Sequence, residues 1–171
     1  MNRFQASKSR ILFFGCLLAT AGIVSRVAVD AAARGQSSES SRASDPWTPE
    51  QTVEPAALVK ELAGPPADRP KVVCVGFRTL YEGAHVPGAS FHGPAMKAEG
   101  LDDLKKWAQP LPRSAGIVIY CGCCPLTHCP NVRPAFTALR QMGFTHVRLL
   151  LLPKDFAHDW VAAGYSVAKG K

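Results

Sequence analysis

The sequence predicts an α/β domain in which a parallel sheet is covered by helices on both faces. Three apolar runs of strand length, at residues 71–77, 116–120 and 147–152, show no alternation of polar and apolar residues. Segments with apolar residues at helical spacing separate these runs. A strand that is buried on both faces is apolar throughout, and parallel strands are joined through crossover helices. The order of these segments therefore predicts a parallel sheet between two layers of helices.

Apolar residues recur at helical spacing in four segments of the chain. Glycine or proline follows each of the first three segments, as is typical where a helix ends. After the third segment, Gly143 is the expected C-cap. The predicted helices are Pro55–Leu62, Leu101–Trp107, Pro134–Met142 and Asp155–Ala163.

The composition is that of a chain that folds around a core. Of the 171 residues, 47% are hydrophobic and 19% are charged, which excludes a wholly disordered chain. Lys and Arg number 20 while Asp and Glu number 13, so the formal net charge is +7. The six cysteines are unevenly distributed, since four of them fall between residues 121 and 129. The charge and the cysteine cluster are the two unusual features of the composition.

The N-terminal segment has the features of an export signal. Arg3, Lys8 and Arg10 precede the apolar run 11–24, and small residues follow it. This arrangement is typical of a secretory signal peptide. An uncleaved signal would instead anchor the protein in the membrane, facing outside the cytoplasm. The expected organisation is a signal peptide at residues 1–33, a Ser-rich flexible leader at 34–47 and the folded domain at 48–171.

Cleavage after Ala33 changes the meaning of the charge. It removes four basic residues and one acidic residue, which leaves 16 and 12 and a net charge of +4. The remaining basic residues form no run of like charge, so we expect no nucleic-acid partner. The expected location is outside the cytoplasm, in the periplasm of a bacterium, with the membrane contacted only through an uncleaved leader. Disulfides persist in that compartment.

The segment that carries reactive groups links a predicted strand to a predicted helix and reads Cys121-Gly-Cys-Cys-Pro-Leu-Thr-His-Cys-Pro-Asn131. In parallel sheets, ligands bind beyond the carboxyl ends of the strands. A cysteine close to the N-terminus of the next helix is stabilised as a thiolate, which is the nucleophilic form. Cys74 lies within the apolar run 71–77 and is interpreted as a buried core residue.

Several pieces of the chain occur in an order that carries a family resemblance. They are the run leading to Arg78, the stretch Ala84-His85-Val86-Pro87-Gly88-Ala89, the pair Tyr120-Cys121, the helix closing on Gly143-Phe144, and Trp160 with Gly164-Tyr165. With these pieces the chain resembles the rhodanese (sulfurtransferase) family over residues 55–167. The resemblance implies a three-layer α/β fold with a central, mostly parallel sheet flanked by helices.

The resemblance also implies an activity, sulfur transfer or sulfur carriage without a cofactor. Cys121 is then the nucleophile that takes sulfane sulfur from a thiosulfate-like donor and passes it to cyanide or a thiol. The implied partners are a small sulfur-containing anion and a thiol acceptor, with His128 and Arg133 as the groups that attract the anion. The other implied loop residues are Gly122, Cys123, Cys124, Cys129 and Asn131, and the implied structural residues are Arg78, His85 and Gly88.

The cysteine loop departs from the family pattern. It is longer than usual and carries three further cysteines, and Gly76 stands where the family commonly has Asp. Rhodanese-fold phosphatases separate their cysteine and arginine by five residues, and no loop cysteine has that spacing from Arg133. Phosphatase chemistry is therefore not expected.

The extra thiols leave two other functions open. In the first, Cys124 or Cys129 is a resolving cysteine that closes a disulfide with Cys121, which makes the protein a thiol–disulfide redox protein. In the second, the loop binds a soft metal ion such as Zn²⁺ or Cu⁺. The candidate ligands are Cys121, Cys123, Cys124, His128 and Cys129.

Overall fold

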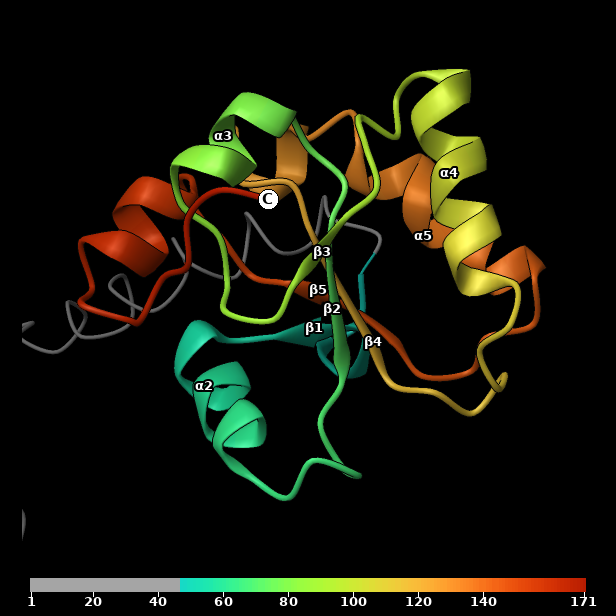
Figure 1. Ribbon diagram of the computed structural model, residues 1–171, viewed down its shortest axis with the longest axis horizontal. Coiled ribbons are helices and arrows are strands. Elements are labelled where there is room, and N and C mark those ends of the chain that lie inside the picture. The colour runs from blue at the N-terminus through green and yellow to red at the C-terminus, as the bar shows by residue number, and fades with distance from the viewer. Residues whose placement is uncertain (1–46) are drawn as a thin grey trace, which may run out of the picture. The chain divides into compact units, whose positions relative to one another are not determined.

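A five-stranded parallel sheet forms the centre of the computed structural model, which describes residues 47–171. The strands are β1 Thr52–Val53, β2 Lys71–Cys74, β3 Ser90–Phe91, β4 Ile117–Tyr120 and β5 Val147–Leu150. The α-helices are α2 Pro55–Ala63, α3 Arg78–Gly83, α4 Ala98–Ala108 and α5 Val132–Gln141. Three short elements complete the chain: the 3-10 turns η1 Pro49–Gln51 and η2 Leu126–His128, and the π-helical turn η3 Ala157–Val161. The strand order is β1-β5-β4-β2-β3, and every neighbouring pair is parallel (Figure 1).

The three central strands lie within the three apolar runs that predicted them. All four residues of β4 are buried, because β4 has a strand on either side and helices over both faces. The two edge strands, β1 and β3, contain two residues each and were not predicted. A two-residue strand is too short to show any period in the sequence, and its pairing is set by the neighbouring strand.

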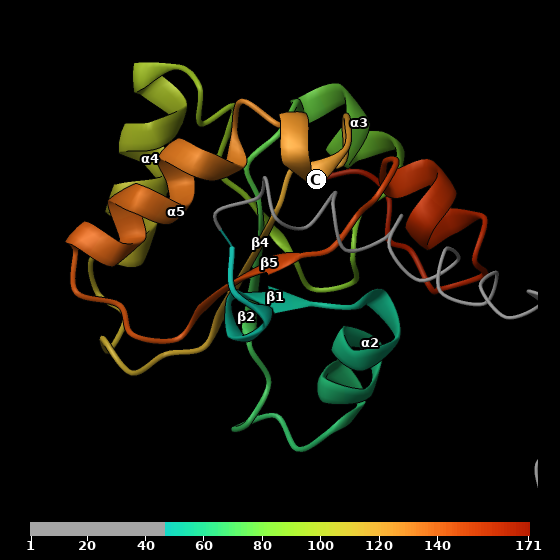
Figure 2. The ribbon, with the colours of Figure 1, turned by 180° about the vertical axis from the view of Figure 1, so that it is seen from behind.

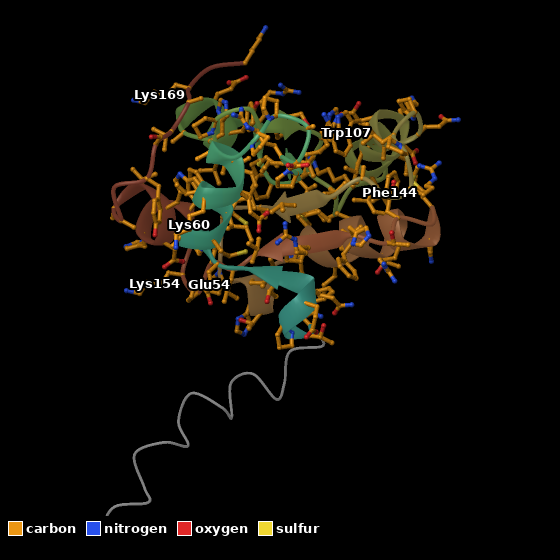
Figure 3. All side chains as sticks on the ribbon, turned by 90° about the horizontal axis from the view of Figure 1, so that it is seen from below. Glu54, Lys60, Trp107, Phe144, Lys154 and Lys169 are labelled. Carbon is orange, nitrogen blue, oxygen red and sulfur yellow. The ribbon has the colours of Figure 1, made fainter. Side chains whose placement is uncertain are left out.

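Alternate side chains of the central strands build two cores on opposite faces of the sheet. Val73 belongs to the core beneath α4 and α5, while its neighbour Val72 belongs to the core beneath α2 and α3. Phe144 and Trp107 pack in the first core, and Figure 3 shows both on the side of α4 and α5, away from Lys60 of α2. The predicted covering of both sheet faces by helices is thus confirmed.

All four predicted helices have different bounds in the structure. α2 ends one residue later, at Ala63, and α4 runs from Ala98 to Ala108 rather than from Leu101 to Trp107. α5 begins at Val132 rather than at Pro134, so Pro134 is its third residue. The missing N–H of a proline costs little there, because the first N–H groups of a helix have no partner within it. The segment predicted as a helix from Asp155 to Ala163 forms only the π-helical turn η3.

The predicted signal peptide and residues 34–46 of the leader lie outside the described residues. Within residues 47–171, no helix is both long enough and apolar enough to cross a membrane.

Candidate functional site

Cys121 is the first residue after β4, at the end of the sheet where α3 begins. Seen from behind, the chain that leaves β4 rises to the same end of the molecule as α3 (Figure 2). Two hydrogen bonds attach the loop to the chain after β5: Phe156 N–H donates to the Gly122 carbonyl at 3.2 Å, and Leu126 N–H donates to the Leu152 carbonyl at 3.1 Å. Gly122 has a φ of 82°, which favours glycine. The loop that follows Cys121 is therefore held against the chain after β5.

Gly76 leaves the space that the Cys121 side chain occupies. A Cβ atom at position 76 would lie 2.4 Å from the Cys121 carbonyl oxygen and 2.9 Å from its Sγ. Both distances are shorter than real Cβ contacts allow. Gly76, which stands where the family commonly has Asp, is therefore required sterically. Only glycine lets the chain after β2 approach Cys121 so closely.

Three cysteine sulfurs lie together at this site. The Sγ atoms of Cys121, Cys123 and Cys129 are all within 4.8 Å of one another, and we call these three residues the sulfur cluster. The Cys121 and Cys123 Sγ atoms are 3.1 Å apart. Cys124 Sγ also lies 3.1 Å from Cys123 Sγ, but Cys124 is not one of the three residues whose sulfurs are all close to one another. All five cysteines among the described residues are free thiols.

Asn131 holds the Cys121 sulfur from the start of α5. Its side-chain amide Nδ2 donates to Cys121 Sγ at 3.3 Å, and its Oδ1 accepts the Met96 N–H at 3.0 Å. Asn131 has no exposed surface. The contact with the Met96 N–H orients the amide so that its NH₂ group faces the sulfur, and this donor favours the thiolate form.

Cys121 and Cys129 affect each other's protonation, because their Sγ atoms lie within 4.8 Å of each other. The interaction with Cys129 and burial raise the pKa of Cys121. The pKa of Cys129 is lowered to about 6 by the interaction with Cys121 and by the N–H groups of Asn131 and Val132, against the effect of burial. The pair therefore carries one proton at neutral pH, and a shift of that proton from Cys121 to Cys129 produces the Cys121 thiolate.

A titration of the thiolate absorbance in the ultraviolet should show one thiolate forming with a midpoint near pH 6. Because the pKa of Cys129 is lower in the folded chain than its ordinary value of 9.0, the Cys129 thiolate stabilises the fold fully above pH 9. This contribution is lost as the pH falls through about 6. Cys129→Ser should remove the midpoint, whereas a midpoint unchanged in this variant would assign it to another group.

Cys74 and Cys124 are held as thiols. Burial raises the pKa of Cys74 to about 11, and its Sγ lies 3.8 Å from the Cys121 carbonyl oxygen. Burial and the contact with Cys123 likewise raise the pKa of Cys124. At neutral pH neither residue is a competing nucleophile.

A cavity of about 370 Å³ opens beside Cys121. Its walls come from α3, from η3 and from the start of the cysteine loop, and most of its lining is apolar, including Leu80, Phe156 and Val161. Asp155 is the one ionisable carboxylate in its lining, and no Lys, Arg or His of the described residues lines it. A larger cavity of about 770 Å³, lined among others by Arg69 and Lys71, contains no residue of the cysteine loop. The smaller cavity is therefore the one that serves Cys121.

His128 and Arg133 lie away from the cavity beside Cys121. The ring of His128 contacts the Thr127 hydroxyl at 2.8 Å, and Arg133 donates to the Thr127 carbonyl at 3.3 Å. The Arg133 guanidinium also lies over the Trp47 ring, 5.3 Å from its centroid. His128 is the last residue of η2 and Arg133 is the second residue of α5, and neither lines the cavity.

The other three predicted residues support the fold around the site. Arg78 lies over the Phe91 ring, 4.3 Å from its centroid. His85 stacks on the Tyr81 ring, and its Nδ1 lies 2.8 Å from the Tyr81 carbonyl oxygen. Gly88 has a φ of 78°, which the turn between His85 and β3 requires. None of these contacts reaches Cys121.

Sequence reasoning missed the roles of Gly76 and Asp155. Gly76 was visible as a departure from the family pattern, but its contact with Cys121 links residues that are distant in the sequence. Nothing in the sequence indicated that Asp155 lines the cavity, because an Asp at the start of a helical segment commonly caps the helix. In the structure its carboxylate accepts the His158 N–H at 2.8 Å. The hydrogen bond from the His158 N–H, more than any other contact, lowers the pKa of Asp155.

No protein-family model matches the chain, and no curated protein matches it. Solved structures do match. The crystal structure of the Alr3790 protein from Anabaena sp. has a TM-score of 0.52 at 24% identity, with 68% of this chain and 82% of that chain covered. The solution structure of the rhodanese-like domain from the same protein has a TM-score of 0.50 at 24% identity, with 70% and 79% covered. The BH2092 protein from Bacillus halodurans has a TM-score of 0.54 at 21% identity, with 70% and 77% covered.

Proposed function

We propose that this chain, whose fold is that of the rhodanese-like domains, transfers sulfane sulfur through a persulfide on Cys121. The observation that carries the proposal is the environment of the Cys121 sulfur. It follows β4 at the carboxyl end of the sheet, it accepts the Asn131 amide at 3.3 Å, and the Cys129 sulfur lies within 4.8 Å of it. At neutral pH the Cys129 thiolate is the base that takes the Cys121 proton, so the nucleophile forms at a position that also lines a cavity.

The reaction consists of two displacements at sulfur. The Cys121 thiolate attacks the sulfane sulfur of the donor, the donor's sulfur–sulfur bond breaks, and the leaving group departs with the electron pair. An acceptor thiolate or cyanide then attacks the outer sulfur of the persulfide, and the Cys121 thiolate leaves. Cys129 holds the proton that Cys121 gives up before the first step, and it returns this proton after the second step.

Intact mass with peptide mapping tests the proposal. The reduced full chain is incubated with thiosulfate or with an alkyl persulfide, and the expected product is one added sulfur atom on the peptide that carries Cys121. A chain that gains no sulfur from either donor, or gains it on another cysteine, contradicts the proposal.

A second candidate function, thiol–disulfide exchange, is favoured by one observation. Cys121 and Cys129 have sulfurs within 4.8 Å of each other and unequal pKa values, which are the properties of an attacking and a resolving thiol. Here a substrate disulfide is reduced to two thiols as the Cys121–Cys129 disulfide forms. The same mass measurement distinguishes this function, because it predicts the loss of two hydrogens rather than the gain of sulfur.

The cavity lining supports an uncharged or weakly charged sulfur compound over thiosulfate. Thiosulfate carries two negative charges, and the only ionised side chain expected in the cavity lining at neutral pH, apart from the cysteines, is the Asp155 carboxylate. We therefore expect Asp155→Asn to raise kcat/KM for thiosulfate by about threefold to tenfold at low ionic strength, and by less at high salt. Alkylation of Cys121 by uncharged iodoacetamide should be unchanged and serves as the control. An equal change in both reactions would show an effect on Cys121 itself.

A further inference from the structure

The sulfur cluster has a composition that sulfur transfer does not require. Persulfide chemistry needs one nucleophile, whereas Cys121, Cys123 and Cys129 place three Sγ atoms within 4.8 Å of one another. Their spacing is short enough for the three sulfurs to contact one ion between them, since metal–thiolate bonds are about 2.3 Å long.

The sulfur cluster is largely buried. Cys121 and Cys129 are 4% and 2% exposed, and Cys123 is half-buried. A small cavity lies against Cys121, Cys124 and Cys129, and its other walls include the apolar side chains of Leu126, Val132 and Leu150. An apolar shell of this kind controls access of solvent to a metal and strengthens its bonds to thiolates.

Hydrogen-bond donors already face two of the sulfurs. The Asn131 amide donates to Cys121 Sγ at 3.3 Å, and the N–H groups of Asn131 and Val132 donate to the Cys129 sulfur. Donors of this kind orient metal-bound thiolates and partly neutralise their charge. They fix two of the three ligands before any ion arrives.

The number of ligands selects the ion. A structural Zn²⁺ site has four protein ligands, and the sulfur cluster supplies three. Cys124 lies outside the mutually close set, and the His128 ring contacts the Thr127 hydroxyl at 2.8 Å. Thiolates are soft ligands that favour Cu⁺, an ion that accepts three-coordinate sulfur sites. We propose that Cys121, Cys123 and Cys129 bind one copper(I) ion through three thiolates.

Copper(I) at this position would regulate the reaction of Cys121. The nucleophile is also a ligand, so the copper-loaded chain cannot form the persulfide, and removal of copper restores the free thiolate. This consequence rests on the proposed function, whereas copper binding itself does not.

Anaerobic titration of the reduced full chain with copper(I), buffered by a chromogenic copper(I) chelator, tests the site. The expected result is one ion per chain, with the ultraviolet absorption of copper–thiolate bonds and an X-ray absorption spectrum with three sulfur neighbours. Cys123→Ser and Cys129→Ser should each weaken the affinity by at least about a hundredfold. Cys124→Ser is the matched control and should keep both the stoichiometry and the three-sulfur spectrum.

Several results would overturn the copper site. They are the absence of tight binding by the wild-type chain, a spectrum with two or four sulfur neighbours, and equal losses in Cys124→Ser and Cys129→Ser. Tight Zn²⁺ binding that needs Cys124 would overturn it as well. Persulfide formation is measured separately on the metal-free wild-type chain, so failure of the copper site and failure of sulfur transfer are distinguishable.

Discussion

Replacing Cys121 by Ser is expected to lower thiocyanate formation from thiosulfate and cyanide by at least about a thousandfold, since loss of a covalent nucleophile removes the reaction path. A serine hydroxyl at position 121 stays protonated at neutral pH, so it does not act as the nucleophile and forms no persulfide. The measurement is the initial rate of thiocyanate production, together with the intact mass after incubation with the donor.

The matched control for this variant is Cys74→Ser, which removes a thiol of the other core. Because burial raises the pKa of Cys74 to about 11, this group is a protonated thiol at neutral pH, and the variant should keep most of the activity. Full activity in Cys121→Ser would refute the assignment of the nucleophile. Equal loss in both variants would indicate a general effect of cysteine removal on the fold.

Gly76→Ala should disrupt the site without replacing a reactive group. The new Cβ would meet the Cys121 carbonyl oxygen at 2.4 Å and Cys121 Sγ at 2.9 Å, so either β2 or the start of the cysteine loop must move. Overpacking of this kind costs about 1–3 kcal/mol in the free energy of unfolding. Because the displaced atoms belong to the nucleophile, we also expect persulfide formation to fall at least about tenfold. Urea denaturation and the mass assay measure the two effects.

Gly116→Ala provides the comparison for this steric argument. A Cβ at Gly116, just before β4, would lie 3.7 Å from the nearest Pro70 atom, which is an ordinary contact. Its stability should change by less than about 0.5 kcal/mol and its activity should be unaffected. If Gly76→Ala behaves like Gly116→Ala, the close approach of β2 to Cys121 is not a requirement of the site.

The fold was predictable because its central strands are buried on both faces. The runs 71–77 and 147–152 have no polar face, and that pattern is specific for parallel strands under helices. The edge strands were not predictable, since the pairing of Val53 with Leu150 and of Ser90 with Val73 depends on strands that are far away in the sequence. The α/β fold with a parallel sheet flanked by helices, implied by the family resemblance, is confirmed by the observed sheet and by the similar solved structures.

The candidate site was less predictable than the fold. The position of Cys121 followed from the strand that precedes it, and the roles proposed for it and for the other loop residues remain predictions. The proximity of Cys129 to Cys121 could not be read from their spacing, because it depends on how η2 folds the intervening residues. His128 in this turn and Arg133 in α5 contact Thr127 instead of lining the cavity, and no pattern in the sequence indicates the direction in which a loop turns.

The hydrogen bonds that attach the cysteine loop to the chain after β5 have a consequence for selectivity. With the Gly122 carbonyl bonded to Phe156 N–H and the Leu126 N–H bonded to the Leu152 carbonyl, the loop cannot swing aside as a flap. Access to the sulfur is then decided by the walls that face it, which carry the exposed side chains of Leu80 and Val161. Under the proposed function, choice among sulfur compounds is a property of α3 and η3, and it can be changed there without rebuilding the cysteine loop.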